Sequence, residues 1–473
     1  MKPTSLNFKL NARHALDDAQ LQRALANVPT GFVGKRAKAR AGLPEFDALR
    51  DTARDIKNHV LANLDLYLEE FERKVSEAGG VVHWARDAAE ARALISDICK
   101  EAGAETVTKG KSMVTEEIAL NGHLEADGFK VVETDLGEYI IQLRGETPSH
   151  IIAPAVHLNK DQVEADFRAA HTDLPDDRPL EETEQLVAEA RAMLRAQFVA
   201  ADVGITGANF LIAETGTTVI VTNEGNGDLT QNLPKTHVVV ASLEKIVPTL
   251  EDVSTILRVL ARSATGQEIS TYTTFSSGPK RDADPDGPDA FHVVLLDNGR
   301  SKLLGTEFAE VLRCIRCGAC INHCPVYHAV GGHAYGWVYP GPIGSVLTPS
   351  LIGVEESGTL PNASTFCGRC EAVCPMHIPL PGLMRKWRAR EFEQNIPPRA
   401  QRMALKLWAF AAKRPWLYRT GARIVMPILA WRGRKTGSFS SLPFAEGWTR
   451  HRNLPAPEGK TFQQQWAAKG GAR

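Results

Sequence analysis

Apolar residues recur at helical spacing through the first part of the chain. Over residues 43–78 they follow one another every three or four positions, which predicts a helix. Gly79-Gly80 ends this pattern. The residues that follow predict a short strand at 81–84 and a second helix at 87–101.

Runs of β-branched and apolar residues then alternate with helical patterns. One long helix is predicted at 181–200. The predicted strands are 130–133, 139–143, 150–153, 218–222, 237–241 and 291–296. Strands and helices that alternate over residues 40–300 predict an α/β domain with a mostly parallel sheet. The acidic, Pro- and Gly-rich segment 279–289 is expected to be a surface loop.

The character of the sequence changes near Gly305. Residues 306–390 contain most of the cysteines, with a loop-like insert at 331–358. Residues 391–435 are predicted to be helical, and the tail after Gly437 is polar and rich in turn residues.

Composition indicates an ordinary folded protein. The chain has 473 residues, 43% of them hydrophobic and 23% charged, which is enough for two or three domains. The net charge of −1 does not favour nucleic acid binding. The N-terminus has no apolar run of signal-peptide length, and the longest apolar stretch, 424–431, is short and interrupted by Pro427. We therefore expect a cytoplasmic protein, where metal or redox chemistry explains cysteines better than disulfides do.

The first cysteine motif has the spacing of bacterial ferredoxins. Cys314, Cys317, Cys320 and Cys324 are followed by Pro325, giving C-x2-C-x2-C-x3-C-P. Three thiolates at this spacing can bind three irons of one [4Fe–4S] cluster, while the fourth points to a neighbouring cluster. Structural zinc is the alternative, but zinc sites typically use two separate cysteine pairs.

A second motif repeats the first without its leading cysteine. It comprises Cys367, Cys370, Cys374 and Pro375, and Ser364 stands where the missing cysteine would be. The crossing rule assigns cluster one to Cys314, Cys317, Cys320 and Cys374, and cluster two to Cys324, Cys367 and Cys370. Cluster two thus lacks a fourth thiolate.

The missing ligand leaves three options for cluster two. It is a [3Fe–4S] cluster, a [4Fe–4S] cluster completed by Ser364, water or a partner residue, or a cluster whose open iron acts as a Lewis acid on substrate. His323 lies inside the first motif, where a supporting role is favoured over ligation. Gly318 and Gly368 are expected to let backbone N–H groups approach the cluster sulfurs. The eighth cysteine, Cys99, lies on an apolar helix face and is expected to be an inert core residue.

Other segments offer weaker candidates for a substrate site. Lys109 and Lys111 stand in a phosphate-loop-like run, but Glu105 occupies the place of the first required glycine, so that interpretation is rejected. The two lysines remain candidates for an anionic substrate, with a solvated basic turn as the alternative. Glu214, in a glycine turn before the strand at 218–222, is the third catalytic candidate, and a second turn spans 224–227. Plain turn chemistry can also explain both turns.

Two further features have alternative interpretations. His150 and His157 flank a predicted strand, and a structural role is favoured over a catalytic one. Residues 384–435 contain 14 Lys or Arg but only two acids, with tryptophans interleaved. Such a segment can lie on an anionic membrane face or dock an acidic partner, and an ordinary solvated helix surface is the plainer alternative.

At this point the chain resembles the lactate utilisation protein B family over nearly its whole length. The motifs that carry the resemblance are the run at 109–117, the segments 133–139, 148–157 and 207–217, and the seven cysteines with serine at 364. Several long segments in the same order make the resemblance specific.

The resemblance implies four regions. They are an N-terminal helical region (1–80), a lactate-utilisation α/β domain similar to ribose-phosphate isomerases and CoA transferases (81–303), a helical ferredoxin-like iron–sulfur domain (304–390) and a basic C-terminal region (391–473).

The same resemblance implies a function within a complex. It indicates an iron–sulfur electron-transfer subunit that works with two companion subunits, one cysteine-rich and one α/β, to oxidise L-lactate to pyruvate. A peripheral position at the inner face of the membrane and a quinone-linked acceptor are further options. A hydro-lyase that uses an open cluster iron and a non-catalytic assembly module are the alternatives. The sequence has no Gly-x-Gly-x-x-Gly fingerprint, so a flavin or nicotinamide is expected on a partner.

Overall fold

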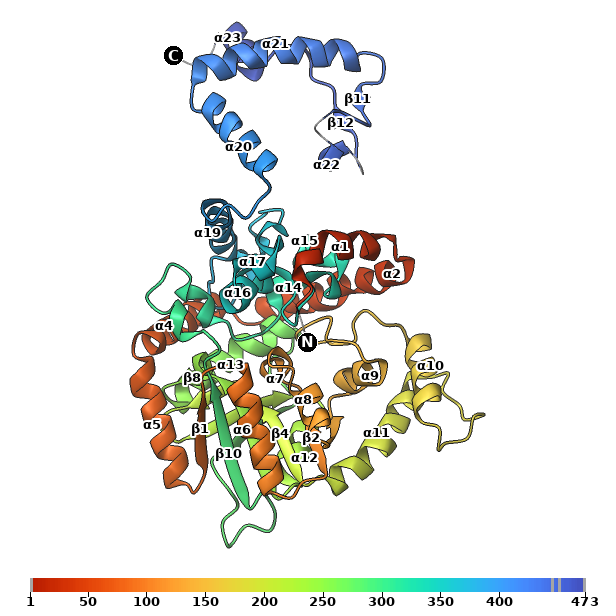
Figure 1. Cartoon of the computed structure of the whole chain (residues 1–473), viewed down its shortest axis with the longest axis vertical. Coiled ribbons are helices and arrows are strands. Elements are labelled where there is room, and N and C mark those ends of the chain that lie inside the picture. Colours follow the sequence, from red (N-terminus) through yellow and green to blue (C-terminus); the bar gives the residue numbers. More distant parts are fainter. Residues whose placement is uncertain (1–2, 444–445, 450–451, 471–473) are drawn as a thin grey trace. The chain divides into compact units, whose positions relative to one another are not determined.

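Two compact units make up the computed structural model, which describes residues 3–443, 446–449 and 452–470. They are Met1–Arg390 and Glu391–Arg473. The first unit is built on a six-stranded sheet in the order β1-β10-β7-β4-β2-β3, with every neighbouring pair parallel (Figure 1). These strands are β1 Val81–Ala85, β2 Thr106–Lys109, β3 Lys130–Glu133, β4 Val203–Gly207, β7 Thr236–Ser242 and β10 Ala290–Leu296. The predicted α/β class with a mostly parallel sheet is confirmed.

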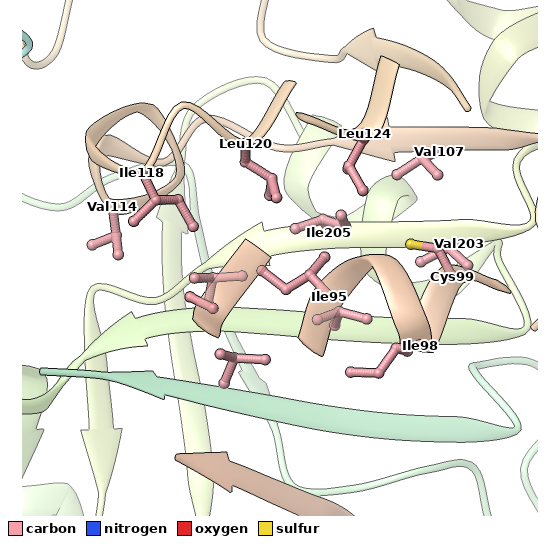
Figure 2. Packing of buried hydrophobic residues seen from close by; sticks show 14 of the residues in the cluster. Ile95, Ile98, Cys99, Val107, Val114, Ile118, Leu120, Leu124, Val203 and Ile205 are labelled. Atoms are coloured by element: carbon pink, nitrogen blue, oxygen red, sulfur yellow. The ribbon is translucent and has the colours of Figure 1, made fainter. Parts of the chain in front are cut away.

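Helices cover both faces of this sheet because its strands are apolar on both sides. On one face, Val238 and Val240 pack with the helices α6 (Ala88–Glu101) and α8 (Leu120–Ala126). Cys99 lies in this cluster beside Ile95 and Ile98 and is fully buried, as expected of a core residue (Figure 2).

The opposite face of the sheet packs on the helices α4 (Phe46–Ala62) and α5 (Leu64–Glu77). Val239 and Ala241 of β7 point to this side. The predicted helix at 43–78 is therefore two helices, which meet at Asn63. A third cluster at the β3 edge is formed by α9 (Leu136–Arg144), α10 (Lys160–Ala170) and α11 (Thr183–Ala200).

A second, four-stranded sheet lies beside the first, in the order β8-β5-β6-β9. Its strands are β5 Phe210–Ile212, β6 Thr217–Thr222, β8 Ile246–Val247 and β9 Tyr272–Ser276. The predicted strand at 218–222 is β6, but it pairs antiparallel with both neighbours. The turn that contains Glu214 follows β5, which pairs parallel with β8, and joins it to the antiparallel β6. It therefore belongs to this second sheet and not to the six-stranded parallel sheet.

Three other predictions need correction. Residues 139–143 form part of α9 instead of a strand, because Asp135 caps the helix by accepting a hydrogen bond from Glu138 N (3.1 Å). Residues 150–153 are a loop, bounded by Pro148 and Pro154. The insert at 331–358 contains a 12-residue helix, α16 (Gly341–Ile352). Its first nine residues are buried, so it lacks the polar stripe that marks a surface helix.

Further helices complete the first unit. Those outside the cysteine segment are α1 Phe8–Asp17, α2 Ala19–Val28, α3 Gly34–Ala41, α7 Met113–Glu117, α12 Asn226–Asn232 and α13 Leu250–Ala264. Those in the cysteine segment and directly after it are α14 Ala319–Asn322, α15 Pro325–Val330, α17 Val354–Ser357, α18 Arg369–Val373 and α19 Leu380–Glu393. The iron–sulfur segment is thus helical, as predicted.

The second unit begins with two long helices, α20 (Arg399–Ala412) and α21 (Pro415–Gly433), which confirms the helices expected over 391–435. A two-stranded antiparallel sheet follows, β11 Ser438–Phe439 with β12 Leu454–Pro455, together with the short helices α22 Glu446–Thr449 and α23 Phe462–Ala468. Across the described part of the chain, every helix is too short or too polar to cross a bilayer.

Candidate iron–sulfur centres and the adjoining cavity

The carboxyl ends of the parallel strands meet at one edge of the sheet, and the cysteine segment packs against that edge. Two contacts fix its position. The Arg316 guanidinium pairs with Glu244, which follows β7, at 3.0 Å. The Tyr339 hydroxyl donates to Glu117, at the end of α7, at 2.7 Å. Ligands of open α/β sheets bind at this edge, so the cysteines lie where a substrate is expected.

A buried ion network connects these contacts. Arg300 binds both carboxylate oxygens of Glu117, at 2.9 and 2.7 Å, and lies 2.9 Å from Glu244. Arg300, Glu117 and Glu244 are each at most 2% exposed at the side chain. Burial alone would raise the carboxyl pKa values, but the guanidinium of Arg300 outweighs it and lowers the pKa of Glu244 to about 2. Both carboxylates are therefore charged, and they lock the cysteine segment to the sheet.

The seven clustered thiols gather in two groups. The Cys320 thiol lies within electrostatic reach of Cys314, Cys317 and Cys374. In the other group, Cys370 interacts with Cys324 and Cys367. Cys320 also interacts with Cys370, so the two groups lie next to each other. Cys374, from the second motif, thus lies among the first three cysteines of the first motif.

Backbone geometry around the thiols fits iron–sulfur clusters. Amide N–H groups approach the sulfurs, with Arg316 N 3.4 Å from Cys314 Sγ and Ile378 N 3.5 Å from Cys374 Sγ. Arg316 and Gly318, on either side of Cys317, have φ values of 59° and 71°. Phe366 and Gly368 repeat this around Cys367, with φ values of 54° and 79°. Left-handed backbone is strained for Arg and Phe, and its recurrence at both motifs is the kind of local strain that marks a functional site.

Arginines from the N-terminal helices surround the first thiol group. Arg36, in α3, donates to the Val373 carbonyl at 2.8 Å. Arg50, in α4, donates to the Cys374 carbonyl at 2.7 Å. Burial raises the pKa of the Cys374 thiol to about 11, while the N–H groups of Ile378 and Met376 and the charge of Arg50 oppose that rise. Positive charge beside a cluster favours its reduced, more negative state.

We expect the Arg50→Gln variant to lower the reduction potential of cluster one. Loss of one nearby charge worth about 1 kcal/mol corresponds to roughly 40 mV for a one-electron couple. The measurement is a redox titration followed by EPR. Arg54→Gln is the matched control, since Arg54 lies one turn further along α4 and pairs with Asp51 and Asp55 at the surface. Equal shifts in both variants would contradict a local effect of Arg50.

The second thiol group has three cysteines, with Cys367 exposed and Cys324 and Cys370 buried. Ser364 Oγ accepts a hydrogen bond from Phe366 N at 3.0 Å. His323 Nδ1 donates to the Ala319 carbonyl at 2.9 Å, which leaves Nε2 as its remaining ring nitrogen. These three thiols match the ligands predicted for cluster two, which lacks a fourth cysteine.

A cavity of about 230 Å³ separates the α/β domain from the first thiol group. Its wall includes Lys111, Asp135, Asn209, Glu224, Lys245 and Cys317. Lys111 follows β2 and Asp135 follows β3. The end of β4 also lies in close contact with the loop after β2. A Cβ atom at Gly207 would lie only 2.8 Å from Ser112 Oγ, so glycine is required there.

Charge is concentrated inside this cavity. Burial and the nearby Asp135 raise the pKa of Glu224, while Lys111 opposes them. Burial lowers the pKa of Lys245 to about 8, with the adjacent Arg316 acting in the same direction. The cavity therefore combines ammonium groups, which can hold a carboxylate, with a carboxyl group of raised proton affinity.

The other residues singled out from the sequence lie outside this wall. The Lys109 ammonium is fully buried, 2.8 Å from Glu116 and 2.7 Å from Glu133. Glu214 is exposed and accepts from Leu250 N at 2.7 Å, at the start of α13. His150 contacts Asn322 at 2.9 Å, and His157 contacts Glu146 at 2.8 Å, as in structural pairs.

Sequence reasoning singled out Lys111 and the turn at 224–227 but missed Asp135 and Lys245. A signal for both was present, because each is a charged residue placed soon after a strand of the parallel sheet. The ion network of Glu117, Glu244 and Arg300 was also missed, since its members are 56 to 183 residues apart in the sequence.

Comparison with known proteins matches three family models along the chain. Residues 68–296 match the LUD domain, 310–378 the 4Fe-4S dicluster domain, and 390–471 the C-terminal region of lactate utilisation protein B. The dicluster match and the seven cysteines indicate that the chain is an iron–sulfur protein with two clusters, which sets zinc aside.

Relatives cover nearly the full length of the chain. "Lactate utilization protein B" of Bacillus subtilis is 42% identical over 97% of this chain and 96% of its own, and the protein of that name from Shouchella clausii is 43% identical over 99% and 98%. The "Uncharacterized electron transport protein YkgF" of Escherichia coli is 40% identical over 99% and 98%. A crystal structure of a duf162 family protein from Deinococcus radiodurans covers 49% of this chain and 98% of its own, at 16% identity and a TM-score of 0.28. The chain thus belongs to the lactate utilisation protein B family.

Proposed function

We propose that this chain is the electron-transfer subunit of a complex that oxidises L-lactate to pyruvate. One observation carries the proposal: the charged cavity of the α/β domain has Cys317, which we assign as a ligand of cluster one, in its wall. A 2-hydroxy acid bound there would lie close to cluster one, which receives its electrons by way of a hydride acceptor.

The cavity residues suit the chemistry of a 2-hydroxy acid. Conversion of lactate to pyruvate releases two electrons and two protons. Lys111 pairs with the substrate carboxylate, and Glu224 accepts the hydroxyl proton. When bound, the clusters carry electrons singly towards an acceptor. A hydride acceptor such as a flavin resides on a companion subunit, since this sequence has no nucleotide fingerprint.

The proposal includes partners and cluster states. Two companion lactate-utilisation subunits, one cysteine-rich and one α/β, complete the complex, and a quinone or another carrier takes the electrons. Cluster one is a [4Fe–4S] cluster, and cluster two is a [4Fe–4S] cluster with a non-cysteine ligand or a [3Fe–4S] cluster. The names of the Bacillus and Shouchella relatives and the electron transport name of the Escherichia coli relative support this function.

A hydro-lyase is the second candidate, favoured by the three-thiol group with its exposed Cys367. An open iron on cluster two would bind a hydroxy acid directly. Against it, the wall of the cavity contains Cys317 of the other group and, among the described residues, none of Cys324, Cys367 and Cys370. A lyase predicts redox-neutral turnover by the isolated chain, whereas an assembly module predicts no binding of lactate in calorimetry.

We expect Lys111→Ala to raise the KM for lactate roughly tenfold to a hundredfold in the assembled complex. Loss of a charge-assisted hydrogen bond costs about 1.5–3 kcal/mol. The EPR signals of both clusters persist, because Lys111 is not a ligand. Lys130→Ala is the control, since Lys130 is exposed at the start of β3. An unchanged KM with intact clusters would remove the cavity from the proposal.

A further inference from the structure

The helix α21 presents an apolar stripe to solvent. Ile424, Ile428 and Trp431 follow one another at the i, i+4, i+7 spacing that places side chains on one helix face. Their side chains are 59%, 56% and 75% exposed. In a globular protein such a stripe normally packs on a core, and here it has none.

The preceding helix, α20, repeats this arrangement. Met403, Leu407 and Phe410 have the same spacing and are all more than half exposed. No residue of α20 is buried. Two consecutive helices of the second unit therefore leave large apolar side chains without protein contacts that cover them.

The charge on these helices has one sign. Between Glu393 and Glu446 the sequence contains no acidic residue. Its basic residues are Arg399, Arg402, Lys406, Lys413, Arg414, Arg419, Arg423, Arg432, Arg434 and Lys435. Arg402 and Lys406 share a face of α20 next to its apolar residues. In α21, Arg423 flanks the apolar stripe directly before Ile424, and Arg419 lies one turn earlier on the same side as Arg423. The surface is thus both strongly basic and strongly apolar.

We infer that the α20–α21 segment binds the surface of an anionic lipid bilayer. Arginine and lysine side chains would contact the lipid phosphates, and the apolar side chains would enter the boundary with the acyl chains, where tryptophan is favoured. An acidic protein surface would match the charge but not the exposed isoleucine and tryptophan. The inference rests on the second unit alone and is independent of the proposed substrate.

The test is flotation of the full-length, cluster-loaded chain with vesicles. Vesicles of phosphatidylcholine with 30 mol% phosphatidylglycerol are compared with pure phosphatidylcholine, at about 0.1 M and 1 M salt. We expect binding to the anionic vesicles at low salt that falls about tenfold or more in Arg419→Gln/Arg423→Gln and in Ile428→Ser/Trp431→Ser. The matched control is Leu66→Ser/Val199→Ser, which replaces two side chains of the first unit that are 62% and 74% exposed.

Three outcomes would overturn the inference. The first is no binding of the wild-type chain to anionic vesicles. The second is an equal loss in the control variant, which would indicate general surface adhesion. The third is a loss in the arginine variant with full binding of Ile428→Ser/Trp431→Ser, which would show that charge alone is recognised, as by an acidic protein. Circular dichroism of each variant checks that the helices persist.

Discussion

Replacement of Cys374 by alanine is expected to remove cluster one, although Cys374 belongs to the second cysteine motif. Its thiol lies among those of Cys314, Cys317 and Cys320, so its loss leaves that cluster with three ligands. We expect the iron content to fall by about half and one of two EPR signals to disappear. Electron transfer from lactate in the complex should stop, because the lost cluster borders the cavity.

Cys370→Ala serves as the partner experiment. It should remove the other EPR signal and leave that of cluster one, since Cys370 interacts with Cys324 and Cys367. If Cys374→Ala and Cys370→Ala abolished the same signal, the two motifs would each hold their own cluster and the crossed arrangement would be wrong. Cys99→Ala should change neither signal, because Cys99 lies in the core of the α/β domain.

Arg300→Met is expected to destabilise the first unit by about 3–5 kcal/mol. The substitution leaves the buried carboxylates of Glu117 and Glu244 without their shared cation. Their pKa values should rise, and the contact that holds Tyr339 of the cysteine segment should weaken. Urea unfolding of the cluster-loaded chain, followed by circular dichroism, measures the change.

A double substitution tests whether Arg300→Met lowers stability through the lost ion pair or through the lost side chain itself. Glu244 keeps its pair with Arg316 when Arg300 is replaced, so Glu117 is the carboxylate left without a cation. Glu117→Leu/Arg300→Met removes that charge, so this variant should be more stable than Arg300→Met alone. Arg258→Met, which breaks a surface pair with Glu45, should change little. A double variant no more stable than the single one would show that the network does not depend on charge pairing at Glu117.

Short-range patterns were sufficient for much of the fold. The seven cysteines and their spacing identified the iron–sulfur segment, because cluster ligation depends on local chain geometry. Alternating strands and helices identified the α/β class. The wrong predictions came from conflicting local signals. Residues 139–143 contain the β-branched pair Ile140-Ile141, but they form a helix that Asp135 caps. The buried helix α16 was not predicted, because a helix surrounded by protein has no periodic polar face.

The site was harder to predict because its members meet through tertiary structure. Lys109 resembled a substrate-binding lysine until β3 placed Glu133 directly opposite it in the parallel register. Lys245 and Asp135 reach the cavity from the ends of different strands. Nothing in the local sequence of Arg36 or Arg50 indicates that they bind carbonyls beside the last cysteine. These relations depend on strand order, which one sequence does not reveal.

The bond from Arg36 to the Val373 carbonyl spans 337 residues and has a consequence for biosynthesis. At about 5–20 residues per second, the ribosome makes α3 roughly 20–70 s before Val373 emerges. The fourth thiol of cluster one, on Cys374, becomes available at the same late moment. Iron and sulfide for cluster one must therefore be delivered after Cys374 has been made, and a ribosome that stops short of this point releases a product unable to mature.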